Sequence, residues 1–246
     1  MLSDADVAAL YDVLSPWNPA LSPGDRFYDT WVMAAGSVLD VGCGTGAMLT
    51  LAREQGHRGR LVGLDPDRAA LDRARRRSDV DWVEGTAAGA TADARFDLAI
   101  MTGHAFQCLV TDDALRSSLA AIHAALRGGG HFVFETRHPQ ARAWEDWNPS
   151  NAVGVVAPVA GTDRALRVWH EVESVAADVV TFAGTAADPD GTVLHTDRSV
   201  LRFLAPAPLN ARLADAGFEI GAQYGDWDRG PLTGTSREIV TVARRR

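Results

Sequence analysis

The residues with the clearest chemical potential are two aspartates and three glycines in the first third of the chain. Asp40 stands two positions before the first of three alternate glycines, and Asp65 follows 19 positions after the third. The glycines are Gly42, Gly44 and Gly46. Glycines let a backbone turn sharply and approach a ligand, and an acid that ends the following strand can accept hydrogen bonds from two ribose hydroxyls. The arrangement predicts a crevice for a nucleoside.

Asp40 distinguishes between two kinds of nucleotide ligand. A Gly-x-Gly pattern alone also occurs in dinucleotide-binding dehydrogenases. An acid at the end of the first strand would repel a pyrophosphate just beyond it, but would attract a cationic amino group and a sulfonium. We therefore favour a cationic nucleoside, with helix capping or bracing of the loop as the alternative role for Asp40.

His104 is the candidate for proton transfer. The segment 101–107 follows an apolar run, and ligands collect beyond the carboxyl ends of strands in an open α/β sheet. Because imidazole titrates near neutrality, His104 could take a proton from a hydroxyl or an ammonium. Capping of the next helix, or packing against adenosine, is the alternative. Phe106 and Gln107 are expected to line the pocket.

Composition excludes several chemistries. All 24 basic residues are arginine, so the chain has neither a Schiff-base lysine nor a P-loop lysine. Two cysteines are too few for a disulfide framework or a structural zinc site, and we expect no metal. The net charge of -8 argues against nucleic acid as a partner. With no apolar leader and no membrane-length run, we expect a cytoplasmic protein without a membrane partner.

Periodicity predicts the elements that must position these residues. Apolar runs alternate with helical patterns from residue 37 onward, which is typical of a parallel α/β sheet. Three glycines at 128–130 are expected to end a long helix in the left-handed conformation. The expected strands are 38–41, 61–64, 81–84, 96–101, 131–136, 218–224 and 237–243, and the expected helices are 4–14, 25–35, 47–55, 67–77, 112–126 and 209–216.

The pattern changes to period two after Pro139. Residues 165–174, 178–185 and 192–204 alternate without intervening helices, and the turn 188–191 predicts a hairpin between the last two. We interpret this stretch as an antiparallel substrate cap. The expected parts are a helical lid at 1–36, a Rossmann-like domain at 37–137 and 207–246, and the cap at 138–206.

The motifs resemble those of the class I S-adenosylmethionine-dependent methyltransferases. Residues 38–46 are similar to the family's first motif, 64–66 to its ribose-binding strand end, 84–86 to its adenine-binding turn and 126–134 to its fifth strand. One departure is Thr86, where the family commonly has aspartate. The resemblance implies an α/β fold with a Rossmann-like, doubly wound seven-stranded sheet of order 3-2-1-4-5-7-6, and an antiparallel β insertion after strand 5.

The resemblance also implies the cofactor and how it is used. S-adenosyl-L-methionine would give S-adenosyl-L-homocysteine, by in-line transfer that depends on alignment and exclusion of water rather than on a metal. The residues assigned to the cofactor are Asp40, Gly42, Gly44, Gly46, Asp65, Pro66, Gly85, Thr86, Thr102 and Gly103.

The acceptor pocket is expected above the carboxyl ends of strands four and five. Trp144 and Trp147 would share a helical face and could enclose a cationic or aromatic acceptor, with core packing as the alternative. Arg137 could pair with a substrate carboxylate, or with Glu135 or Asp146. The complete set of candidates is Tyr11, Trp17, Phe27, Tyr28, Glu135, Arg137, His138, Trp144 and Trp147.

The leading hypothesis is an N- or O-methyltransferase that acts on a small molecule, such as a secondary metabolite, as a monomer or homodimer. One alternative is a nicotinamide-dependent oxidoreductase, which Asp40 and the lack of a recognisable Tyr and Lys relay disfavour. The other is an accessory protein that binds S-adenosylmethionine without catalysis.

Overall fold

The main sheet has the strand order that the motifs imply. The computed structural model describes residues 1–90 and 95–246, and its seven-stranded sheet has the order β10-β11-β5-β4-β1-β2-β3. The first five strands run parallel, whereas β11 is antiparallel to both of its neighbours. This confirms the predicted order. The strands are β1 (Ser37–Val41), β2 (Arg60–Asp65), β3 (Asp81–Glu84), β4 (Phe96–Met101), β5 (Leu126–Arg137), β10 (Phe218–Tyr224) and β11 (Glu238–Arg245).

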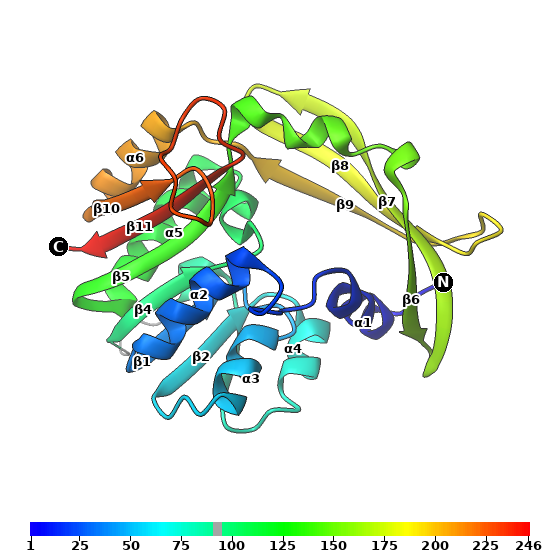
Figure 1. Ribbon diagram of the computed structural model, residues 1–246, viewed down its shortest axis with the longest axis horizontal. Coiled ribbons are helices and arrows are strands. Elements are labelled where there is room, and N and C mark those ends of the chain that lie inside the picture. Colours follow the sequence, from blue (N-terminus) through cyan, green and yellow to red (C-terminus); the bar gives the residue numbers. More distant parts are fainter. Residues whose placement is uncertain (91–94) are drawn as a thin grey trace.

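Helices cover both faces of this sheet (Figure 1). Side chains alternate along each strand, so that Leu39 and Val41 pack toward α5 and α6 while Val38 packs toward α2 and α3. The helices are α1 (Asp4–Leu14), α2 (Pro23–Ala34), α3 (Ala47–Glu54), α4 (Arg68–Ala74), α5 (Asp112–Ala125) and α6 (Pro206–Asp215). Short 3₁₀ helices cover Ala87–Gly89, Ala105–Cys108, Pro139–Ala141, Ala143–Asp146 and Pro149–Asn151.

The end of α5 differs from the prediction. Its amino end is capped by Thr111 as expected, but its carboxyl end passes directly into β5 because Leu126 is already extended (φ −79°, ψ 149°). The glycine cap is therefore wrong. The glycines 128–130 instead lie where the β4–β5 register shifts between Leu126 and His131. They therefore lie at a register shift inside β5, and this strand begins five residues earlier than predicted.

The second sheet is antiparallel and contains one strand that the sequence did not reveal. Its order is β6-β7-β8-β9, with β6 (Val153–Val159), β7 (Thr162–Ala176), β8 (Val179–Ala187) and β9 (Val193–Arg202). The hairpin at 188–191 is confirmed, with Gly191 at φ 93°. Pro158 obscured β6 in the sequence, and an edge strand is where a sheet tolerates proline.

Helix α1 lies between the two sheets (Figure 1). Leu10 belongs to the apolar cluster of the cap sheet with Val159 and Leu166. The Asp12 carboxylate accepts hydrogen bonds from the Thr45 hydroxyl and the Arg73 guanidinium on the other side. The helix thus connects the cap sheet to the glycine loop. Within the described parts of the chain, no helix combines the length and apolar character needed to cross a bilayer.

Candidate active site

The glycine loop after β1 borders a cavity of about 520 Å³. Gly42 and Gly44 line it, and both have a positive φ. Gly46 does not line the cavity. It caps α3 in the left-handed conformation (φ 76°), where a Cβ would fall 2.3 Å from a ring carbon of Trp82. The first two glycines therefore bring backbone to the cavity, while the third lets the helix begin against β3.

The opposite walls come from the ends of β2, β3 and β4. Tyr11 on α1 also lines the space, and its hydroxyl lies 3.5 Å from where a Cβ of Gly103 would be. The volume is within the usual range for small-molecule sites. The other residues assigned to the cofactor that line the cavity are Asp65, Pro66, Gly85, Thr86, Thr102 and Gly103.

Three carboxylates gather at the carboxyl ends of the strands. Asp40 is 2% exposed, lies behind the cavity wall, and its Oδ1 atom has no hydrogen-bond partner. Burial, then Asp65 and Glu135, raise the pKa of Asp40 well above its usual range. Burial also raises the pKa of Asp65, although this carboxylate accepts bonds from the Gly44 and Asp67 amides at 2.7 and 2.8 Å. The described residues provide no ion-pair partner within 4 Å for any of the three.

These carboxylates act on one region of space. Burial, followed by Asp65, Asp40 and Glu135, raises the pKa of the Tyr11 hydroxyl, which lies in the cavity wall. The cavity is thus bordered by carboxyl groups from three strand ends. A ligand that carries positive charge would favour their ionised form and would be attracted to it.

Glu135 connects helix α2 to the segment that follows β4. It is 2% exposed and accepts hydrogen bonds from the Tyr28 hydroxyl and, at 2.7 Å, from the His104 backbone amide. Burial raises its pKa, although both bonds act in the opposite direction. His104 has φ 63° and ψ 21°, a conformation that few non-glycine residues adopt. The Glu135 contact holds the backbone in this conformation.

The imidazole of His104 faces Glu238, a residue that sequence reasoning missed. Its Nε2 atom lies 3.1 and 3.2 Å from the two carboxylate oxygens of Glu238. Glu238 begins β11 and pairs with Arg137 across the ladder, 134 positions from His104. No local motif could indicate this contact, because only the reversed β11 brings the two together. His104 occupies a helix N-cap position, but its side chain makes no capping bond.

The residues around His104 divide between cavity and core. Gly103 and Ala105 line the cavity, whereas the ring of His104 points toward β11. Phe106 does not line the pocket as expected, because it stacks on Phe134 in the core at 4.3 Å. Gln107 is buried and donates to the Arg202 carbonyl at 3.1 Å. It is absent from the cavity wall as well.

Most aromatic acceptor candidates pack against other protein side chains. Trp144 lies edge-on to Phe203, and Trp147 packs on Phe182, each with ring centroids 4.6 Å apart. The segment is a short 3₁₀ helix rather than an α-helix. His138 is buried and accepts from the Gln140 amide. Trp17, Phe27 and Tyr28 pack in one aromatic cluster with Trp227.

The cavity fits a nucleoside with a cationic amino-acid arm. Asp65 presents a carboxylate beside the space, and Gly42 and Gly44 leave room for a ligand along the backbone. The unpartnered oxygen of Asp40 lies behind the same loop. S-adenosylmethionine has this combination of ribose, ammonium and sulfonium, so the residues present suit it.

Comparisons with known proteins agree with this fit. A family described as a methyltransferase domain matches residues 38–130. The cypemycin N-terminal methyltransferase of Streptomyces sp is 28% identical, over 98% of this chain and 97% of its own. The 2-phytyl-1,4-naphtoquinone methyltransferase of Thermosynechococcus vestitus is 29% identical, over 97% and 96% respectively.

Solved structures share the fold. The CcbJ methyltransferase from Streptomyces caelestis superposes with a TM-score of 0.73 at 21% identity, covering 99% of this chain and 98% of its own. An amino pentose methyltransferase from Micromonospora echinaspora, solved with S-adenosylmethionine bound, superposes with a TM-score of 0.65 at 25% identity. The match covers 92% of this chain and 93% of that one. The matches favour methyl transfer over the dehydrogenase alternative. Residues 38–130 therefore match a methyltransferase domain, and the glycine loop, the acidic strand ends and the strand order make the chain similar to class I S-adenosylmethionine-dependent methyltransferases.

Proposed function

We propose that the chain methylates an amine nitrogen of a small molecule. Two similar proteins support this by name, because one is an N-terminal methyltransferase and the other acts on an amino pentose. The name of the naphtoquinone methyltransferase gives no support to an amine acceptor, so the choice of acceptor atom rests on the site itself.

The observation that carries the proposal is the set of buried carboxylates without a cation. An alcohol or phenol becomes a strong nucleophile only as its oxygen loses its proton and gains negative charge, which carboxylates at Asp40, Asp65 and Glu135 would oppose. An amine develops positive charge on nitrogen as it attacks, which the same field stabilises. The arrangement therefore suits an amine better than a hydroxyl.

The chain's own residues hold the reactants in this proposal. S-adenosylmethionine supplies an electrophilic methyl group on a positively charged sulfur. Asp65 accepts hydrogen bonds from the ribose hydroxyls, Thr86 lies beside the adenine, and Tyr11 covers the cavity from α1. The segment 1–36 acts as the lid and 138–206 holds the acceptor, in a cytoplasmic monomer or homodimer.

We assign to His104, which lies between the cavity-lining residues Gly103 and Ala105, the proton that the acceptor loses. Its Nε2–H donates to Glu238 in the tautomer that this pair favours, which leaves Nδ1 as an acceptor. The nitrogen lone pair forms the bond to carbon as the carbon–sulfur pair returns to sulfur, and the N–H proton passes to Nδ1. Glu238 thereby positions the base and stabilises the imidazolium.

The test is methyl transfer to pairs of amines and alcohols with the same carbon skeleton, followed by formation of S-adenosylhomocysteine. Amines are expected to react faster. His104→Ala should lower kcat by about 100-fold, the usual contribution of a general base, and leave the affinity for S-adenosylhomocysteine unchanged. Glu238→Gln should have a smaller effect in the same direction.

A matched control is His123→Ala, because His123 lies in α5 and packs on Phe218 of β10, away from the cavity. It should retain full turnover. Preference for alcohols would contradict the proposed acceptor atom. Full activity of His104→Ala would contradict the proton-transfer role.

A further inference from the structure

Arg137 is a largely buried cation without an anion of its own. Among the described residues, no carboxylate oxygen lies within 4 Å of its guanidinium, so neither Glu135 nor Asp146 pairs with it. Its side chain donates to Gln107 Oε1 at 3.1 Å and lies over the ring of Trp147, 5.4 Å from the centroid. Burial lowers the pKa of Arg137. Buried arginines are rarely left without a partner.

The nearest acids are committed elsewhere. Glu135 accepts from Tyr28 and from the His104 amide, and Glu238 faces His104 Nε2. Both carboxylates raise the pKa of Arg137 at a distance, but the desolvation of the guanidinium is the larger effect. The positive charge is therefore available to a ligand.

The guanidinium is held in one orientation. Gln107 accepts bonds from both the side chain and the backbone amide of Arg137, and its own amide group donates to the Arg202 carbonyl. Trp147 supports the flat face of the group. A planar fork held in this way loses little freedom when it binds a planar anion.

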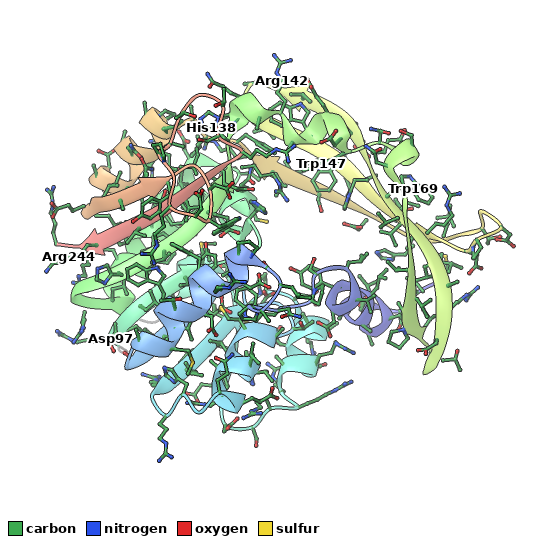
Figure 2. The ribbon with its side chains drawn as sticks, viewed as in Figure 1. Asp97, His138, Arg142, Trp147, Trp169 and Arg244 are labelled. Carbon is green, nitrogen blue, oxygen red and sulfur yellow. The ribbon has the colours of Figure 1, made fainter. Side chains whose placement is uncertain are left out.

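Arg137 lies between the cofactor cavity and the cap. Its guanidinium is bonded to Gln107, the chain neighbour of Cys108, and Cys108 lines the cavity. On its other side the guanidinium lies over Trp147, which borders a hollow of about 280 Å³ together with His170. Figure 2 shows Trp147 on the segment that crosses from β5 to the cap sheet.

We propose that the acceptor carries a carboxylate in the same molecule as its amine, and that this carboxylate binds the Arg137 guanidinium through two parallel hydrogen bonds. The inference rests on the proposed amine methylation. The opposite charges of the site orient the molecule: the anionic end meets Arg137, and the amine faces the carboxylates behind the cavity. Amino acids and related amino carboxylic acids are the substrate class.

The experiment measures binding of simple probes to the protein saturated with S-adenosylhomocysteine. Calorimetric titration compares benzoate with benzamide, its neutral counterpart, and with phenyl phosphate. Benzoate should bind most tightly, and Arg137→Gln should weaken it by about tenfold or more, as expected for loss of a charge-assisted pair. Arg137→Lys, which keeps the charge but not the fork, should give an intermediate loss.

Arg142→Gln is the matched control. The Arg142 side chain is 65% exposed, pairs with Glu145 and points outward (Figure 2). Benzoate affinity should be unchanged in this variant. Equal binding of benzamide, or unaltered benzoate binding in Arg137→Gln, would overturn the inference. Phenyl phosphate binding more tightly than benzoate through Arg137 would overturn the choice of carboxylate.

The design separates this inference from the proposed function. Retained affinity for S-adenosylhomocysteine shows that each variant is folded. If Arg137→Gln does not fold, Arg137→Lys still tests the inference, because it should bind benzoate more tightly than benzamide but more weakly than the unmodified protein does. A wild-type protein that methylates amines yet ignores benzoate contradicts only the anchor. A protein that binds benzoate through Arg137 yet prefers alcohols contradicts only the proposed acceptor atom.

Discussion

Among the residues described, acidic side chains have an ion-pair partner at the amino end of the parallel sheet and lack one at the carboxyl end. At the amino end, Asp97 lies 2.6 Å from Arg127 and accepts from the Ser37 hydroxyl at 3.0 Å. Figure 2 places it at the edge of the molecule, away from the cap. At the carboxyl end, Asp40 and Glu135 are buried and have no ion-pair partner among the residues described. The same residue type is compensated at one end and left uncompensated at the other.

The difference indicates what each end is for. A buried carboxylate without a cation costs free energy, so a fold under selection for stability alone would pair it or replace it. Retaining such groups beside a cavity is typical of functional sites, where a ligand supplies the missing charge. The carboxyl groups at this end therefore favour a ligand that supplies positive charge beside them.

The largest expected effect is at Asp65. Replacing it with alanine removes the proposed acceptor for the ribose hydroxyls and the bonds that hold the Gly44 and Asp67 amides. Two charge-assisted hydrogen bonds together correspond to about 100-fold in affinity for S-adenosylhomocysteine. Calorimetric titration measures the change.

Asp97→Ala is the control for the other end of the sheet. Its affinity for S-adenosylhomocysteine should equal that of the unmodified protein. A similar loss in both variants would mean that Asp65 acts through general stability rather than through ribose.

The second prediction concerns Asp40→Asn. The pKa of Asp40 is higher in the folded state than in the unfolded state. The ionised carboxylate therefore destabilises the folded state, and it does so most at neutral pH. The contribution of Asp40 to the free energy of unfolding is fully present below the pKa of the unfolded state. It is lost as the pH rises toward the pKa of the folded state. Asparagine removes this loss, so urea unfolding at neutral pH should show a gain on the order of 1 kcal/mol.

The same variant should bind S-adenosylhomocysteine about tenfold more weakly, since it removes a charge near the ammonium. Opposite changes in stability and affinity are the distinguishing result. A less stable Asp40→Asn protein would indicate that the carboxylate braces the loop, the alternative that the sequence left open.

Most residues that the sequence assigned to the cofactor line one cavity, for a physical reason. Asp40, the glycines and Asp65 lie within 26 positions, and their roles depend on local turns and on strand ends. The strand order followed from motifs of the same kind. Elements were less accurate where context overrides local preference, as at the glycines 128–130 and at β6.

The acceptor half could not be predicted in the same way. The pairing of His104 with Glu238 depends on the β5–β11 register, which no short segment encodes. The two tryptophans could pack on the cap or face an acceptor, and only the positions of Phe182 and Phe203 show their packing. The sequence predicts Arg137 as one possible anchor, but the absence of a nearby carboxylate among the described residues is a property of the folded chain.

The smallest expected effect is at the compensated end. Asp97→Asn removes an ion pair whose arginine side chain is 60% exposed, so it should destabilise the protein by about 1 kcal/mol or less. Urea unfolding at low and high salt measures this. A loss much larger than that of a partly exposed pair would mean that the two ends differ less than proposed.

The most direct test of the central claim is proton release on cofactor binding. S-adenosylhomocysteine brings an ammonium to the carboxylates and should lower the raised pKa of Asp40, so binding releases protons and strengthens with pH between the two pKa values. Calorimetry below neutrality should give heats that differ between phosphate and Tris buffers. The difference should vanish with 5′-methylthioadenosine, which lacks the ammonium, and in Asp40→Asn. Buffer-independent heats for S-adenosylhomocysteine would contradict the account.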